Sequence, residues 1–199
     1  MSSDPKDARR KEILGAALKA FTEKGYDKTS MDDIVRVSGL SKGTLYWYFD
    51  NKQALFAAVA KMVFDQFVTL ADAALGNLKN LAPSEKLRQV MLMSGMSAIE
   101  DRQFVHFYFD IFVQAWQQDL IQQVSKEAYS KYIALIGAIL QEGIDTGDFR
   151  AMDVNATARA ITGSLDGMMA QLLFGPDGEI EAPLQALVET LVRGLMKGD

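Results

Sequence analysis

The sequence lacks several residues that catalytic and structural sites commonly need. None of its 199 residues is cysteine, and His106 is its single histidine. The absence of cysteine excludes disulfides, a thiolate nucleophile and a cysteine zinc site, and a single histidine excludes a metal site with paired histidine ligands. We therefore expect no metal and no other cofactor.

Long apolar runs are also missing. The longest stretch without a charged residue runs from Gln89 to Ile99 and has only eleven residues. A membrane-spanning helix needs about 20 apolar residues, so we expect none and no membrane partner. The first residues, Met1 to Lys6, contain no apolar core that could serve as a secretory signal. These absences predict a soluble, cytoplasmic protein.

Charge is distributed unevenly along the chain, whose net charge is −5. Residues 1–61 carry 11 basic and 8 acidic residues, which gives +3, whereas residues 62–199 carry 10 and 18, which gives −8. Because neutralising phosphates is a local effect, the positive first third is compatible with nucleic-acid binding in an otherwise acidic protein.

Helical spacing of apolar residues dominates the sequence, and its four prolines lie outside the strongly periodic segments. For example, Ile13, Ala17 and Phe21 form one i, i+4 row. Gly25 and the glycines of the segment 143–147 are expected to end helices. The pattern predicts an all-α fold with helices over residues 8–24, 31–37, 42–49, 51–78, 83–99, 102–118, 119–143, 153–174 and 181–197.

The segment from Thr29 to Lys52 has the organisation of a helix-turn-helix. Ser30 and Ser41 are suitable N-caps of two short helices, and Gly39 provides the tight turn between them. The second helix of such a motif can enter the major groove of DNA.

The second short helix has two different faces at 100° per residue. Leu45 and Phe49 share the face that must pack inward, whereas Gly43 and Trp47 point the opposite way. The outer face is flanked by Thr44, Tyr46 and Tyr48. Large aromatic side chains are costly to expose, and a DNA groove would explain them, since tyrosine hydroxyls reach phosphates and rings pack on sugars. The alternative is that these aromatics pack against neighbouring helices.

The residues of these helices resemble the DNA-binding domain of the TetR family of transcriptional regulators over residues 8–61. The matching motifs are ILGAALKAF (13–21), KGY (24–26), TSMDDI (29–34) and SKGTLYWYF (41–49) followed by Asn51 and Lys52. The resemblance implies an N-terminal three-helix helix-turn-helix domain over residues 1–50. A helical effector-binding and dimerisation domain is implied over residues 51–199.

The resemblance also implies roles for individual residues. The positions that match DNA contacts of the family are Thr29, Lys42, Gly43, Thr44, Tyr46, Trp47, Tyr48 and Lys52. The implied partners are a double-stranded DNA operator, a small-molecule effector and a second copy of the chain.

Aromatic and methionine residues gather in the middle of the sequence. The segment 102–118 is apolar nearly all round, which indicates a helix that is buried on several sides or lines a cavity. The candidate ligand-binding residues are Met62, Gln66, Phe67, Met93, Tyr108, Phe112, Trp116, Tyr132 and Asp166. The alternative is that the apolar stripes are plain core. Asp110 is expected to face solvent on the polar edge of this helix.

The last two helices carry rows suited to close packing. A row of small residues on the first includes Ala160, Gly163 and Gly167, and a leucine row on the second comprises Leu184, Leu187, Leu191 and Leu195. Two such helices from each subunit would form a four-helix bundle, which predicts a dimer interface. The alternative is burial within one subunit.

Two functions from different classes agree with these features. The first is a ligand-responsive DNA-binding regulator, a repressor that a small hydrophobic or aromatic effector releases from a palindromic operator. The second is a helical carrier or enzyme that retains the fold without binding DNA. The sequence shows no nucleophile–base pair, metal cluster or phosphate loop, so we expect a protein that is not an enzyme.

Overall fold

The computed structural model describes residues 4–99, 102–174 and 180–198, and the described residues form nine α-helices. The helices are α1 (Pro5–Lys24), α2 (Met31–Ser38), α3 (Lys42–Tyr48), α4 (Lys52–Asn77), α5 (Pro83–Ile99), α6 (Arg102–Gln117), α7 (Asp119–Thr146), α8 (Val154–Phe174) and α9 (Glu181–Leu195). The predicted all-α class is confirmed, and each predicted helix is present.

The chain divides into two compact units. The first, called the head unit, comprises Met1–Asp65 and His106–Ala128, and the second, called the body unit, comprises Gln66–Val105 and Tyr129–Asp199. Packing therefore groups part of α4, most of α6 and the start of α7 with the N-terminal helices. The boundary between a DNA-binding domain (1–50) and an effector-binding and dimerisation domain (51–199) stays a prediction.

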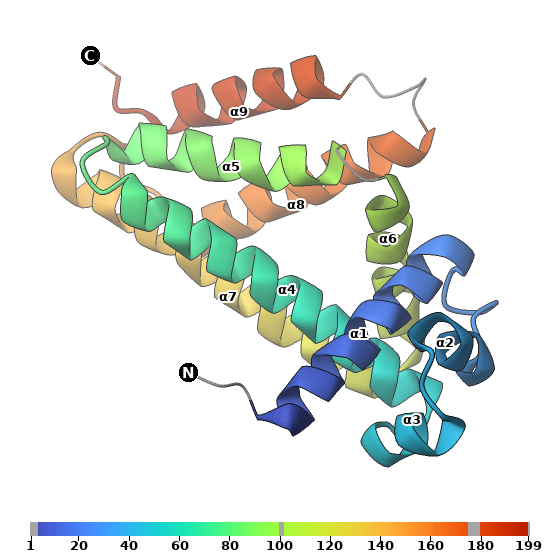
Figure 1. Cartoon of the computed structure of the whole chain (residues 1–199). Helices are drawn as coiled ribbons and strands as arrows, with labels where there is room; N and C mark the ends of the chain where they lie inside the picture. Colours follow the sequence, from blue (N-terminus) through green and yellow to red (C-terminus); the bar gives the residue numbers. More distant parts are fainter. Residues whose placement is uncertain (1–3, 100–101, 175–179, 199) are drawn as a thin grey trace. The chain divides into compact units, whose positions relative to one another are not determined.

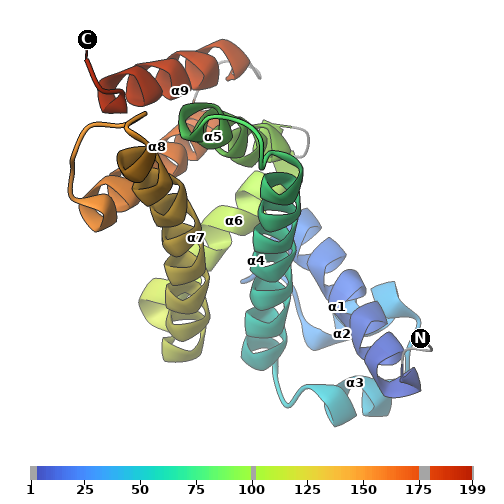
Figure 2. The same ribbon diagram turned by 90° about the vertical axis from the view of Figure 1, so that its left-hand side faces the viewer.

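In the head unit α1 packs on α2 and α2 on α3, as Figure 2 shows. Aromatic rings extend this core to α4 and α6. The ring of Phe56 lies 5.0 Å from that of Phe21 and 5.4 Å from that of Phe107, centroid to centroid. All three side chains are fully buried. Burying three rings of this size dominates the local energetics, so α6 is part of the platform that carries the helix-turn-helix.

Helix α1 begins three residues earlier than predicted. Its N-cap is Asp4, whose carboxylate accepts a hydrogen bond from the Lys6 amide at 3.0 Å, and Pro5 occupies the first helical position, where its missing N–H costs nothing. The helix ends as predicted at Gly25, which has a φ of +76°.

Helix α7 does not end at Gly143, as the sequence suggested, but continues to Thr146 and is followed by Gly147 with a φ of +81°. Gly143 serves a different purpose. A Cβ atom at Gly143 would clash with the ring of Phe149, and the Phe149 amide donates to the Gly143 carbonyl at 2.9 Å. The glycine is therefore required for close approach of a buried ring rather than as a stop signal.

In the body unit α5 packs against both α8 and α9 (Figure 1). Leu87, Val90 and Met91 of α5 are fully buried in a core shared with these helices. At its edge the Arg88 guanidinium donates to Glu189 of α9 at 2.9 Å. The ion pair is partly exposed, so it contributes little to the stability of the packing between α5 and α9.

The predicted dimer residues separate into three groups. Leu184 and Leu195 are buried inside the body unit, because α9 uses this side of its leucine row to pack within its own chain. They therefore offer no surface to a partner, and their assignment to the interface is corrected. Leu187 and Leu191 are half-buried. The exposed group comprises Ala160, Gly163 and Gly167.

Helix α4 is long and apolar enough to cross a membrane by length and composition alone, contrary to the expectation from uncharged runs. Buried core helices of soluble proteins meet the same criterion. Leu55, Phe56 and Val59 of α4 are fully buried in the head unit, so its apolar residues already have protein partners there.

Candidate nucleic-acid interface

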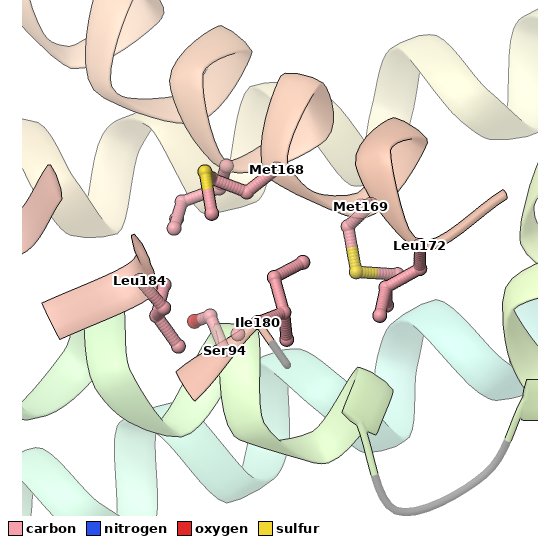
Figure 3. Close-up of a pocket in the computed structure, with 8 residues that line it drawn as sticks. Ser94, Met168, Met169, Leu172, Ile180 and Leu184 are labelled. Carbon is pink, nitrogen blue, oxygen red and sulfur yellow. The ribbon is translucent and has the colours of Figure 1, made fainter. Parts of the chain in front are cut away.

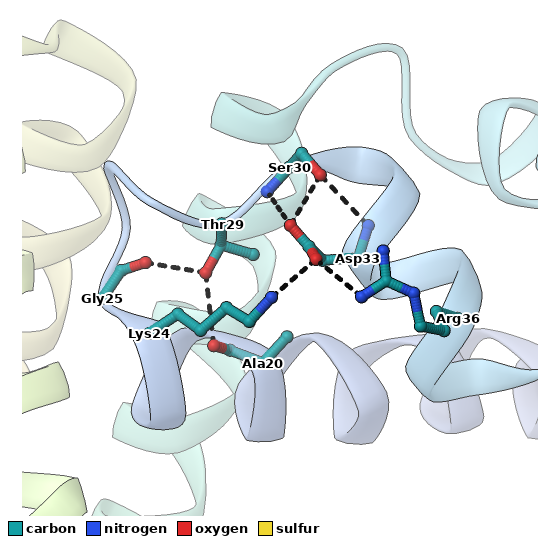
Figure 4. A network of polar contacts seen from close by, with 7 residues as sticks. All are labelled: Ala20, Lys24, Gly25, Thr29, Ser30, Asp33 and Arg36. Atoms are coloured by element: carbon teal, nitrogen blue, oxygen red, sulfur yellow. Dashed lines mark hydrogen bonds and ion pairs between the residues drawn. The ribbon is translucent and has the colours of Figure 1, made fainter.

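A network of polar contacts fixes the start of α2 (Figure 4). The Asp33 amide donates to the Ser30 hydroxyl oxygen at 3.1 Å, and the Ser30 amide donates to the Asp33 carboxylate at 3.0 Å, which forms a capping box. The same carboxylate accepts from Lys24 at 2.6 Å and from Arg36 at 3.2 Å. The hydrogen bonds from Lys24 and Ser30 hold the pKa of Asp33 well below its usual range.

Thr29, a predicted phosphate contact, lies inside the head unit. Its side chain is buried, and its hydroxyl is 2.7 Å from the Gly25 carbonyl and 3.2 Å from the Ala20 carbonyl. The hydroxyl therefore ties the α1–α2 turn to α1 (Figure 4), and the geometry gives no support to a DNA contact through it.

Helix α3 presents the two faces that its sequence predicted. Ser41 caps it by accepting from the Thr44 amide at 3.1 Å. Leu45 and Phe49 are buried, whereas Trp47 is 66% exposed and Tyr46 is 43% exposed. The predicted inward and outward faces are confirmed, and the alternative that Trp47 and Tyr46 are packed away does not hold within the described residues.

The two lysines that the motif assigned to DNA are already engaged. Lys42 forms an ion pair with Asp32 at 2.8 Å, and this hydrogen bond raises the pKa of Lys42. Lys52 donates to the Tyr26 carbonyl at 2.8 Å and lies 4.2 Å from the Tyr26 ring centroid. Gly43 is exposed and Thr44 is half-buried at the start of α3, where the Thr44 hydroxyl is 2.8 Å from that of Ser41.

The start of α1 contacts residues 47–49 at the C-terminal end of α3, which the sequence did not predict. The Lys6 ammonium lies 5.0 Å from the Trp47 ring centroid, and the Arg10 guanidinium carbon lies 5.3 Å from that of Phe49. The Tyr48 hydroxyl donates weakly to the Lys6 carbonyl at 3.4 Å. The i, i+4 spacing of the two cations is visible in the sequence, but their proximity to α3 is tertiary.

Asp110 corrects another expectation, since it does not face solvent. Its carboxylate is half-buried and accepts a hydrogen bond from the Tyr26 amide at 2.8 Å. Burial raises the pKa of Asp110, and the bond from Tyr26 opposes that rise. The acid pairs with a backbone N–H in the turn that follows α1, where a buried amide needs a partner, so its place on an aromatic helix has a structural reason.

The body unit contains an apolar pocket between α5, α8 and α9, with a cavity volume of about 20 Å³. Figure 3 shows Met168, Met169 and Leu172 of α8 directed toward Ser94 of α5. The rest of the lining consists of Gly95, Leu165, Ile180 and Leu184. This cavity is far smaller than a small-molecule site of roughly 300–1,000 Å³. Its methionine side chains are flexible, so they can rearrange to enlarge it.

None of the nine predicted ligand-binding residues lines this pocket. In the body unit the Tyr132 ring lies 5.6 Å from that of Phe67, and its hydroxyl is 2.9 Å from that of Ser94, which does line the pocket. Burial raises the pKa of Tyr132 to about 12. Asp166 accepts from the Tyr129 hydroxyl at 2.9 Å.

The other predicted ligand residues are spread over both units. In the head unit the rings of Tyr108 and Phe112 are 5.1 Å apart, Met62 is half-buried, and Trp116 is 91% exposed. Gln66 and Met93, in the body unit, are exposed. Among the described residues no group of three or more histidine, cysteine, aspartate or glutamate side chains is arranged to hold a metal ion.

Two family models match the chain. Residues 13–59 match the model of bacterial regulatory proteins of the tetR family, and residues 83–197 match the C-terminal domain of BetI-type transcriptional repressors. The chain is 27% identical over 175 residues to the HTH-type transcriptional regulator YfiR of Bacillus subtilis, with 87% of this chain and 84% of that protein covered.

Solved structures share the fold. A TetR transcription regulator from Haloarcula marismortui superposes with a TM-score of 0.87 at 18% identity, covering 96% of this chain and all of that one. The regulator FadR from Bacillus subtilis, solved in complex with stearoyl-CoA, gives a TM-score of 0.77 at 24% identity, covering 92% of this chain and 98% of that one.

The capping network at Asp33 predicts a pH-dependent contribution to stability. Because its native pKa is lowered, the carboxylate stabilises the fold above the usual aspartate pKa of about 3.9, and this contribution is lost as pH falls through the lower native value. The difference in unfolding free energy between the wild type and Asp33→Asn should be largest near neutral pH and shrink in acid.

Urea unfolding measured across this pH range checks the prediction. The matched control is Asp27→Asn, since Asp27 is exposed and its side chain makes no ion pair within residues 4–99. A difference for Asp33→Asn that is independent of pH would contradict the network.

Proposed function

Because the chain belongs to the TetR family of bacterial regulatory proteins, we propose that it is a transcriptional repressor that binds an operator through α3. The observation that carries the proposal is the outward face of α3. Trp47 is 66% exposed while Leu45, on the opposite face, is fully buried. A helix anchored on one side and aromatic on the other is suited to enter a major groove.

The proposed contacts follow from this exposure. Tyr46 and Trp47 supply rings for sugars and bases, the Tyr48 hydroxyl and the exposed backbone at Gly43 approach phosphates, and Thr44 lies beside them. Residues 1–50 are the proposed DNA-binding domain, and residues 51–199 the effector and dimerisation domain. The proposal assigns no catalytic role to the chain and places it in the cytoplasm.

The Trp47→Ala variant should lose operator affinity by about tenfold or more, because a good base or groove contact contributes about 1–3 kcal/mol. Its melting temperature should change little, since most of the side chain is exposed. The operator is first obtained by selecting bound duplexes from a random-sequence pool, and affinity is then measured by gel shift.

The matched control is Trp116→Ala, which removes the other tryptophan, also exposed, from α6. This variant should keep the wild-type affinity. Equal affinities of all three proteins would argue against α3 as the reading helix.

We propose further that the effector is an apolar molecule bound in the pocket beneath Met168 and Met169. The support is the apolar lining, together with the acyl-CoA that the FadR structure contains. A cavity of about 150 Å³ binds benzene, so the present volume of about 20 Å³ must grow for a single ring or a short acyl chain to enter. We expect the flexible side chains of Met168 and Met169 to move aside for the effector. To release DNA, the effector must bind the two states of the repressor unequally.

Octanoyl-CoA should raise the melting temperature of the chain, because a ligand of the native state adds stability that grows with its concentration. Free coenzyme A should not. The Met169→Gln variant should weaken the shift, since it places a polar amide in the apolar lining.

The control variant is Met93→Gln, whose methionine is exposed and does not line the pocket. A shift equally reduced by both substitutions, or no shift with octanoyl-CoA, stearoyl-CoA or indole, would overturn this effector proposal and leave the DNA-binding proposal standing.

The proposed dimer uses α8, which presents exposed Ala160, Gly163 and Gly167 on one row. A Cβ atom at Gly163 or Gly167 would meet nothing within 4 Å in the chain itself, so these positions are open toward a partner. Small residues permit close approach of a helix from a second subunit. We expect the half-buried Leu187 and Leu191 of α9 to add apolar contacts to this interface.

The Gly163→Leu variant should dissociate the dimer, because its side chain would fill the space that a partner helix needs, whereas nothing in its own chain obstructs it. Light scattering after size-exclusion chromatography measures the mass. Gly76→Leu, at an equally open and exposed position in α4, should stay dimeric. If both variants remain dimeric, the row of small residues on α8 is not part of the interface.

A further inference from the structure

We infer that Lys6 and Arg10, at the start of α1, form a phosphate-binding pair beside the recognition helix α3, and that Trp47 positions Lys6 for this contact. The inference rests on the proposed DNA-binding function and deepens it. It adds two residues that lie outside the segment from Thr29 to Lys52, in which the sequence places every DNA contact.

The geometry puts both cations on one face of α1, four residues apart, against α3. Lys6 lies 5.0 Å from the Trp47 ring and Arg10 lies 5.3 Å from the Phe49 ring. The Tyr48 hydroxyl also reaches the Lys6 carbonyl, so backbone as well as side chain connects the two helices. Two cation–π contacts at i, i+4 spacing fix the direction in which the charges point.

Charge pairing separates these two cations from others in the head unit. Lys42 is paired with Asp32, Lys24 and Arg36 share Asp33, and Lys52 is bound to the Tyr26 carbonyl. A phosphate must compete with a carboxylate or carbonyl for each of them. Neither Lys6 nor Arg10 forms an ion pair in the described part of the chain, and both are exposed.

A cation–π contact leaves the N–H groups of the cation available. The ring interacts with one side of the ammonium or guanidinium, and the remaining donors can bind phosphate oxygens. Arg10 can do so in bidentate fashion, and Lys6 as a point charge. A regularly spaced phosphate backbone is the anion that a recognition helix brings to this position, so the pair is assigned to DNA rather than to an acidic peptide.

The experiment measures how the affinity of the full-length chain depends on salt. The probe is a fluorescently labelled duplex of unrelated sequence, which isolates phosphate contacts from base readout. Each lost phosphate contact should reduce the magnitude of the slope of log K against log salt by about 0.9. The slope of the double variant Lys6→Gln/Arg10→Gln should therefore be smaller by about 2 for each head unit that binds DNA.

The matched control is Lys19→Gln/Lys126→Gln, which removes two exposed positive charges from the head unit away from α3. It should keep the wild-type slope, and so should the charge-conserving Lys6→Arg/Arg10→Lys variant. A wild-type slope in Lys6→Gln/Arg10→Gln, or an equal fall in the control, would overturn the inference alone. Failure of the wild-type chain to bind any duplex would instead overturn the proposed function.

The positioning role of Trp47 has its own readout. Trp47→Leu should lower affinity for the same duplex more in the wild-type background than in the Lys6→Gln background, because without Lys6 the ring has no charge to place. Equal losses in the two backgrounds would show that Trp47 acts independently of Lys6.

Discussion

The turn between α1 and α2 depends on the backbone of Tyr26, which is held from two sides. Its amide donates to Asp110 at 2.8 Å and its carbonyl accepts from Lys52 at 2.8 Å. An unpaired polar group at this buried turn would cost about 1–3 kcal/mol. The two partners belong to α6 and α4. The turn that leads into α2 is therefore held by residues from two helices outside the turn. The neighbouring Gly25, with a φ of +76°, allows the chain to enter this arrangement.

Several positively charged residues of the head unit also have structural roles. Its positive residues suggested DNA binding, but several are used in the fold: Lys24 secures the start of α2, and Lys52 secures the turn. Net charge alone therefore does not identify the contacts. Lys6 and Arg10 lie against aromatic rings at the end of α3 and form no ion pair or hydrogen bond through their charged groups within the described residues. An aromatic partner holds a cation in place without neutralising it.

The fold was largely predictable because its signals are local. The caps of α2 and α3, and the burial of Leu45 opposite Trp47, follow from neighbours within four residues. The wrong predictions concern a residue whose partner lies far along the chain, or a residue type that can serve two structural purposes. Asp110 binds an amide 84 positions away, and Gly143 permits close packing of Phe149 where a glycine usually signals a helix end. The candidate ligand residues do not line the pocket between α5, α8 and α9 for a similar reason. An aromatic stripe in the sequence does not determine which helices pack against it.

The sequence by itself determined that the chain is all-α, that its first third holds a helix-turn-helix, and that Trp47 lies on the outer face, because a period of 3.6 residues fixes sides of a helix without reference to the rest of the molecule. Only the tertiary structure decided which cations remain unpaired and that Leu184 packs inside its own chain. It also decided that Met168 and Met169 line a pocket. These properties depend on which helix faces meet, and that is settled by burial and pairing over long sequence separations.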